Sequence, residues 1–320
     1  MSIKKLFSGF VIISLMMTSL AGCTGQSEPP SIQLVPEGVT LLGEIQVSRI
    51  LNDQDLINAY NSWEKGPDQP QTMEDALKKA AETTGLDLLS FSRAVVFGDV
   101  NTFEKAPYVG LILEGTFVEA KLITSMEEKS SENFTRSNYK GYKTYTGGKD
   151  QRFNVAFLGN KVLLFGTTKA VQDIIDVRKG DRKAVNGVIL DTYNHLGDSM
   201  CRFSFNIPDT ARQSLAKQSV PGSPVSTKAF ASMDVSGLAF DKQVTNLTIE
   251  IVAHFLDAAS TQDARDTLIG AVLMFKGMST VPELKGLLGK IKVTTQDNWV
   301  TISENTTIPE LEKLVDAFRK

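Results

Sequence analysis

The sequence of 320 residues contains only two cysteines and two histidines, so metal-binding and nucleophilic chemistry have few residues to use. A zinc site needs several histidine or cysteine ligands at characteristic spacing, and the sequence has no such set. It also has no Gly-x-Ser-x-Gly elbow, no phosphate-binding glycine loop and no dinucleotide-binding glycine pattern. We therefore predict no metal and no cofactor, and we assign no catalytic residue.

A strong excess of one charge is also missing. The formal net charge is −3, and 22% of the residues are charged against 42% that are apolar, which is ordinary for a globular protein. Binding to nucleic acid would favour a concentrated basic patch, so we expect no nucleic-acid partner. The length suits two domains or one large domain.

Long apolar runs are absent except near the N-terminus, where residues 6–20 follow two lysines. This run is shorter than the about 20 apolar residues of a transmembrane helix, and serine and threonine interrupt it. A charged start, a short apolar run and small residues before a cleavage site are typical of a secretory signal peptide. The run ends in Leu20, Ala21, Gly22 and Cys23. This ending resembles the lipobox of bacterial lipoproteins, and an uncleaved membrane anchor is the alternative.

The resemblance implies that a signal peptidase recognises residues 20–22 and that Cys23 becomes a lipidated N-terminus, with the membrane as its partner. Cys201 would then be the only other thiol, which excludes an intramolecular disulfide, and it is expected to be a small buried apolar residue. Loss of the two N-terminal lysines changes the formal charge from −3 to −5. Because Thr24 is not Asp, we expect the periplasmic face of the outer membrane in a two-membrane cell. In a one-membrane cell we expect the outer face of the cell membrane.

The periodicity of the remaining chain predicts two α+β lobes. We predict a signal peptide over residues 1–22, a lipidated N-terminus and tether over 23–36, a first lobe over 37–195 and a second over 196–320. In the first lobe we expect strands at 41–47, 93–99, 108–113, 139–145 and 153–165, the last turning at 159–160, and helices at 49–65, 72–84, 116–129 and 169–178. In the second we expect strands at 202–207, 230–240, 246–255, 290–295 and 299–303, and helices at 209–218, 260–275 and 311–318.

The two halves repeat the same order of elements at low identity. Val155 and Val162 are seven residues apart, as are Val293 and Val300, and an asparagine follows the first valine of each pair by five residues. We therefore expect two similar lobes from an internal duplication, each a mainly antiparallel sheet with helices on one face. Two unrelated α+β segments are the alternative.

A few polar residues are candidates for chemistry, each with a structural explanation beside it. Paired carboxylates could serve as acid and base, but helix capping or a solvated surface explains the same residues. His195 is predicted in a loop between the lobes, and His254 near a strand end. The two carboxylate pairs are Asp53 with Asp55 and Asp173 with Asp176.

One segment points to a ligand. Residues 268–275 are eight consecutive apolar residues on a predicted helix, more than one sheet face needs. One interpretation is a helix buried on both sides, for instance between the lobes. The other is a groove for a lipid or a partner helix, lined by Leu268, Ile269, Val272, Leu273 and Phe275.

These observations favour binding over catalysis. The leading hypothesis is a membrane-anchored lipoprotein of the cell envelope that binds or scaffolds another envelope protein without catalysis. The second hypothesis is a carrier or chaperone for lipid or another apolar ligand. The third is a hydrolase that uses carboxylates alone and acts on envelope glycans.

Overall fold

The computed structural model describes residues 30–63, 65–66, 69–84, 86–102, 107–130, 134–147, 153–217 and 227–319. The predicted signal peptide and Cys23 lie outside these residues. The fold is α+β, as expected, and the chain divides into two compact units. Of the described residues, those between 30 and 39 and between 44 and 185 form unit 1, and those between 40 and 43 and between 186 and 319 form unit 2. Strand β1 (Leu41–Ile45) is therefore divided between the units.

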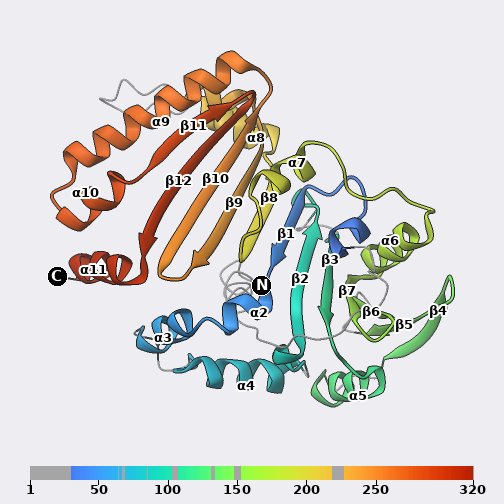
Figure 1. The fold of residues 1–320 in the computed structure, drawn as a ribbon. Helices are drawn as coiled ribbons and strands as arrows, with labels where there is room; N and C mark the ends of the chain where they lie inside the picture. The colour runs from blue at the N-terminus through green and yellow to red at the C-terminus, as the bar shows by residue number, and fades with distance from the viewer. Residues whose placement is uncertain are drawn as a thin grey trace. The chain divides into compact units, whose positions relative to one another are not determined.

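Unit 1 is an antiparallel sheet with strand order β2-β3-β7-β6-β5-β4 and helices on both faces (Figure 1). Tyr142 and Tyr145 on β5 point to opposite faces: Tyr142 lies under Lys179 of α6, and Tyr145 donates a hydrogen bond to Glu119 of α5. The strands are β2 (Phe91–Gly98), β3 (Val109–Gly115), β4 (Thr135–Tyr139), β5 (Tyr142–Gly147), β6 (Phe153–Leu158) and β7 (Val162–Thr167). The helices are η1 (Ser31–Leu34), α2 (Val47–Leu51), α3 (Gln54–Ser62), α4 (Met73–Thr84), η2 (Leu88–Ser90), α5 (Glu119–Ser130) and α6 (Thr168–Lys179).

Helix α6 shows how the local sequence specifies an element. The side chain of Thr167 accepts a hydrogen bond from the Ala170 amide at the helix start, and Gly180 ends the helix with φ 79°. Between them, apolar residues at helical spacing form one fully buried side: Ala170, Val171, Ile174 and Ile175. The amphipathic helix expected over 169–178 is therefore confirmed.

Three expectations for unit 1 need correction. Residues 31–36 are not tether: η1 packs into the unit because Leu34 and Val35 are apolar and become buried. The single helix expected over 49–65 is two helices, because the Asp53 side chain caps a new start by accepting from the Leu56 amide at 3.0 Å. The strand expected over 139–145 is a hairpin that turns at Lys140 and Gly141, both with positive φ.

Unit 2 is also an antiparallel sheet, with order β11-β12-β10-β9-β8. Helix α7 packs on β8, β9 and β10, and α9 packs on the other face through Leu268, which contacts Phe255 and Val300 (Figure 1). The strands are β8 (Cys201–Asn206), β9 (Met233–Gln243), β10 (Asn246–Phe255), β11 (Lys292–Gln296) and β12 (Trp299–Thr307). The helices are α7 (Val188–His195), α8 (Asp209–Lys217), η4 (Lys228–Ser232), α9 (Ala258–Met278), α10 (Pro282–Leu288) and α11 (Ile308–Arg319).

The first helix and the boundary of unit 2 differ from the expectation. His195 is not in a loop but ends α7, which begins after Gly187 and buries Ile189, Thr192 and Tyr193. Because α7 packs on the second sheet, the units divide after Val185, whereas the sequence analysis placed the boundary after residue 195. Helix α10 begins at Pro282 and was not expected.

The expected internal duplication is not confirmed. The two strand orders do correspond, since β2-β3-β7-β6 and β9-β10-β12-β11 follow the chain in the same way. The two valine pairs, however, do not occupy equivalent positions in the two sheets. The β6–β7 register places Val155 and Val162 on opposite faces, whereas Val293 and Val300 share a face because their hairpin turns at 297–298, one residue shorter.

Candidate functional site

One face of the unit 2 sheet carries a row of apolar side chains across every strand. The register places five residues directly opposite one another from β11 to β8: Val293, Ile302, Ile251, Leu238 and Phe203. Ile302 shares its face with Val300, which contacts α9, so this is the α9 side of the sheet. We call these five residues the apolar row.

The apolar row is only partly covered. Leu238 is 43% exposed and Ile251 is 38% exposed, although both lie on inner strands of the unit 2 sheet. Helix α9 packs against the neighbouring row through Leu268, beside Val300 and Phe255. A face that alternation marks as apolar therefore remains open to solvent at its centre.

The residues predicted to line a groove all lie on α9 but have different surroundings. Leu268 packs on the core, and Ile269 and Val272 are half-buried. Leu273 is 63% exposed and Phe275 is 56% exposed. The helix is therefore not buried on both sides, because its C-terminal half presents apolar side chains to solvent. The groove itself stays a prediction.

A carboxyl group borders the apolar row. Glu304 lies two residues after Ile302, directly opposite Ile249, and its Oε1 atom is buried without a hydrogen-bond partner among the described residues. Burial raises the pKa of Glu304, and nearby Lys290 lowers it. Cys201 lies in the same row of the register. It is half-buried, whereas a fully buried position was expected from the sequence. A polar group thus stands next to an apolar surface, an arrangement that can hold one end of an amphiphilic molecule.

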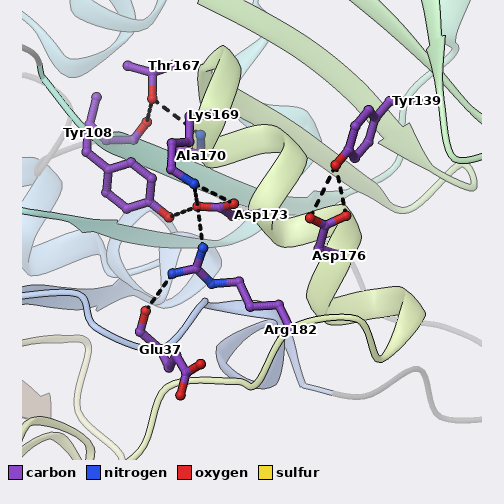
Figure 2. Close-up of polar contacts among 10 residues, drawn as sticks. Glu37, Tyr108, Tyr139, Thr167, Lys169, Ala170, Asp173, Asp176 and Arg182 are labelled. Atoms are coloured by element: carbon purple, nitrogen blue, oxygen red, sulfur yellow. Dashed lines mark hydrogen bonds and ion pairs between the residues drawn. The ribbon is translucent and has the colours of Figure 1, made fainter.

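Asp173 of unit 1 is neither a cap nor a solvated residue. It is buried and accepts hydrogen bonds from Tyr108 at 2.9 Å and from Lys169 at 2.9 Å, and Arg182 Nη1 lies 2.9 Å from its Oδ2 (Figure 2). Burial, and then the hydrogen bond to Asp173, raises the pKa of Tyr108. Arg182 also donates to the carbonyl of Glu37 at 3.0 Å. The Asp173 cluster therefore connects the segment around Glu37 with the segment after α6.

Asp176 has separate partners. Its carboxylate accepts a hydrogen bond from Tyr139 at 3.1 Å (Figure 2). It also forms an ion pair with Lys140 at 2.7 Å. Hydrogen bonds to Asp176 and Asp181 raise the pKa of Lys140. Asp173 and Asp176 therefore belong to two structural clusters instead of facing each other as an acid–base pair.

The other candidate residues form no metal site. Within the described ranges, no three His, Cys, Asp or Glu side chains are grouped so that they could hold a metal ion. In the same part of the chain, no helix has both the length and the apolar character needed to cross a membrane. The lipobox residues Leu20, Ala21, Gly22 and Cys23 lie outside the described residues.

Comparisons with known proteins identify no family. No family model and no curated protein matches the chain. Solved structures of TP0453 are similar in outline. Crystal form I has a TM-score of 0.47 and 10% identity over 91% of this chain and 97% of that chain. Crystal form III has a TM-score of 0.46 and 10% identity over 91% and 99%. At these values, we infer no function and no residue role from the likeness.

Sequence reasoning missed the apolar row because it considered each segment alone. The alternation of apolar and other residues along each strand nevertheless carries a signal. Phe203, Leu238 and Ile251 each have another apolar residue two positions away on the same strand. Only the pairing register shows that these residues form one surface.

Proposed function

We propose that this chain is a lipid-anchored protein of the bacterial cell envelope that binds an apolar ligand of the alkyl-chain class without catalysis. The observation that carries the proposal is the partly exposed apolar row on the α9 side of unit 2, together with exposed Leu273 and Phe275 on α9 itself. Large apolar side chains exposed together on a folded protein mark binding sites more often than isolated ones do.

The composition of the surface favours an alkyl chain over a polar ligand. The apolar row continues across the strands without a charged side chain, so long hydrocarbon could lie against it and displace water. Glu304 borders the row and could accept a hydrogen bond from a hydroxyl or amine head group. Scaffolding of another envelope protein through the same surface is the second candidate function, favoured by the exposed side chains of α9.

The anchor is tested with Cys23→Ala. Without the thiol no diacylglyceryl group can be attached, so we expect the precursor to lose lipid incorporation and to leave the membrane fraction. A Cys201→Ala variant is the matched control and should remain lipidated. Continued lipid incorporation by Cys23→Ala would refute the anchor.

Ligand binding is tested with an alkyl-chain probe such as a fluorescent fatty acid. Ile251→Asp places a charge in the centre of the apolar row, and we expect it to weaken probe binding at least about tenfold. Thr294→Asp is the control, because Thr294 is exposed on the opposite face, opposite Thr301. Circular dichroism checks that both variants fold.

Two further results would decide between the candidates. Bound probe should slow the reaction of the Cys201 thiol with a small labelling reagent, because Cys201 lies on the same face. Equal probe binding by the native chain and Ile251→Asp would refute the alkyl-chain proposal. Loss of a crosslinked envelope protein in Ile251→Asp, with no probe binding by the native chain, would favour scaffolding.

A further inference from the structure

Both histidines of the chain contact the same tryptophan in unit 2. His195 at the end of α7 stacks on Trp299 with ring centroids 4.1 Å apart and an interplanar angle of 21°. His254 on β10 is directly opposite Trp299, and its ring lies 4.6 Å from the indole at 57°. Asp234 Oδ1 is 2.7 Å from His254 Nδ1. We call His195, Trp299 and His254 the ring stack.

Two acidic groups interact with the histidines of the ring stack, namely Asp234 with His254 and Glu250 with His195. His195 Nδ1 lies 3.0 Å from the Asp191 carbonyl oxygen. Glu250 on β10 also interacts with His195: burial raises the pKa of Glu250, and His195 lowers it. Arg202 lies over the ring of Tyr193 at 3.9 Å and donates to the Gly197 carbonyl, so its charge is held near α7. On the α7 face of the sheet, Arg202, Glu250 and Lys292 share one row of the register, four residues along the strands from the row of His254 and Trp299. Asp191 lies on α7 itself.

We propose that the ring stack is a proton-sensitive clasp, in which protonation of His195 and His254 tightens the end of α7 against β10 and β12. Histidine changes its charge between about pH 8 and about pH 5, so the clasp would respond to mild acidification. The inference stands on the geometry of unit 2 and does not depend on the proposed ligand.

The direction of the pH effect follows from the groups that contact the two histidines. An imidazolium at His195 would lie against the face of an indole, where a cation is attracted by the ring, and near the carboxyl group of Glu250. An imidazolium at His254 would form an ion pair with Asp234. Arg202 and Lys292 oppose both effects, but their row lies four residues along the strands from Trp299, whereas Asp234 lies 2.7 Å from His254. We expect acidification to favour the closed contact about two- to five-fold.

The first test uses the full-length chain with Trp63→Phe, which leaves Trp299 as the only tryptophan. Because an imidazolium in contact quenches indole fluorescence, we expect emission to fall between about pH 8 and about pH 5.5. The further changes His195→Gln and His254→Gln should remove that fall. Emission that does not change in Trp63→Phe, or that falls equally in the triple variant, would overturn the proposal.

The second test separates a proton-sensitive clasp from a merely structural stack. Urea unfolding of Trp63→Phe, followed by Trp299 emission, is compared with and without His195→Gln. We expect His195→Gln to reduce the folded-to-unfolded ratio about two- to five-fold more at about pH 5.5 than at about pH 8. Asn194→Gln, at an exposed position on α7, is the matched control. It should change the folded-to-unfolded ratio by the same factor at both pH values. An equal cost of His195→Gln at both pH values would show a structural role only.

Discussion

Replacing Asp173 with alanine should destabilise unit 1 more than any surface substitution. The variant leaves Arg182 and Lys169 without their shared carboxylate, and it leaves the Tyr108 hydroxyl without its acceptor. Removing one partner of a buried ion pair costs about 3–5 kcal/mol. Lys169 is 68% exposed and contributes little, since an exposed ion pair contributes about 0–1 kcal/mol. Arg182 is 30% exposed, which places the expected cost near the low end, at about 3 kcal/mol.

Hydrogen exchange measures this loss within unit 1. The amides of Ile174 and Ile175 lie on the buried side of α6, and about 3 kcal/mol corresponds to roughly a hundredfold faster exchange if they open with the unit. Glu82→Ala, an exposed carboxylate on α4, is the control and should change exchange by no more than about two-fold. Native exchange rates in Asp173→Ala would refute the structural role of the cluster.

A second variant tests the mechanism of that loss. If the cost comes from stranded charges and not from lost volume, Asp173→Leu together with Arg182→Met should recover part of the stability, because neither charge is then left unpaired. We expect the double variant to cost at least about 1 kcal/mol less than the sum of the two single changes. Strict additivity would refute the ion-pair explanation.

Three further substitutions test packing and burial. Gly110→Ala would drive a methyl group into the buried ring of Phe97, so we expect a loss of about 1–3 kcal/mol in urea unfolding, whereas Gly286→Ala in α10 meets no atom within 4 Å and should gain up to about 1 kcal/mol. Glu304→Gln should stabilise the protein near neutral pH. Burial raises the pKa of Glu304 in the folded state, so its ionisation opposes folding as pH rises through that value. The gain should disappear at a pH below the ordinary carboxyl pKa, and a constant gain at every pH would contradict the burial argument.

The sequence predicted most strands and helices because their periodicity is local. Helix α6 was expected at nearly its observed bounds, because a capping threonine, an apolar side and a final glycine all lie within 14 residues (167–180). Helix α7 was missed because it begins at a bare glycine and is short, and its burial depends on strands that come later in the chain. The hairpin at Lys140 was missed because a non-glycine residue with positive φ gives little signal in sequence.

The candidate site was harder to predict because it depends on pairing. The α9 residues were found from an uninterrupted apolar run, but Phe203, Leu238 and Ile251 come from three strands and meet only through the register. The role of Asp173 was missed for the same reason. Spacing on a helix shows which side Asp173 occupies but cannot show that Arg182 and Tyr108 lie against it.

The last helix of each unit explains why unit 2 retains an exposed apolar surface. Helix α6 follows β7 and buries its apolar side against a sheet face that carries Ile112, Ala156 and Leu164, all fully buried. Helix α11 follows β12 in the corresponding topological place, yet none of its described side chains through Phe318 is buried, and Val315 is exposed. On its α7 side, β12 presents polar side chains, namely Thr301, Ser303 and Asn305.

An apolar helix side gains nothing by packing on such a face, because hydroxyl and amide groups would lose water without gaining partners. The apolar side of α11 and the apolar row are therefore only partly covered, whereas unit 1 buries the apolar side of the equivalent helix. Since exposed apolar area costs free energy in water, its retention at the centre of the unit 2 sheet supports the proposed binding at this surface.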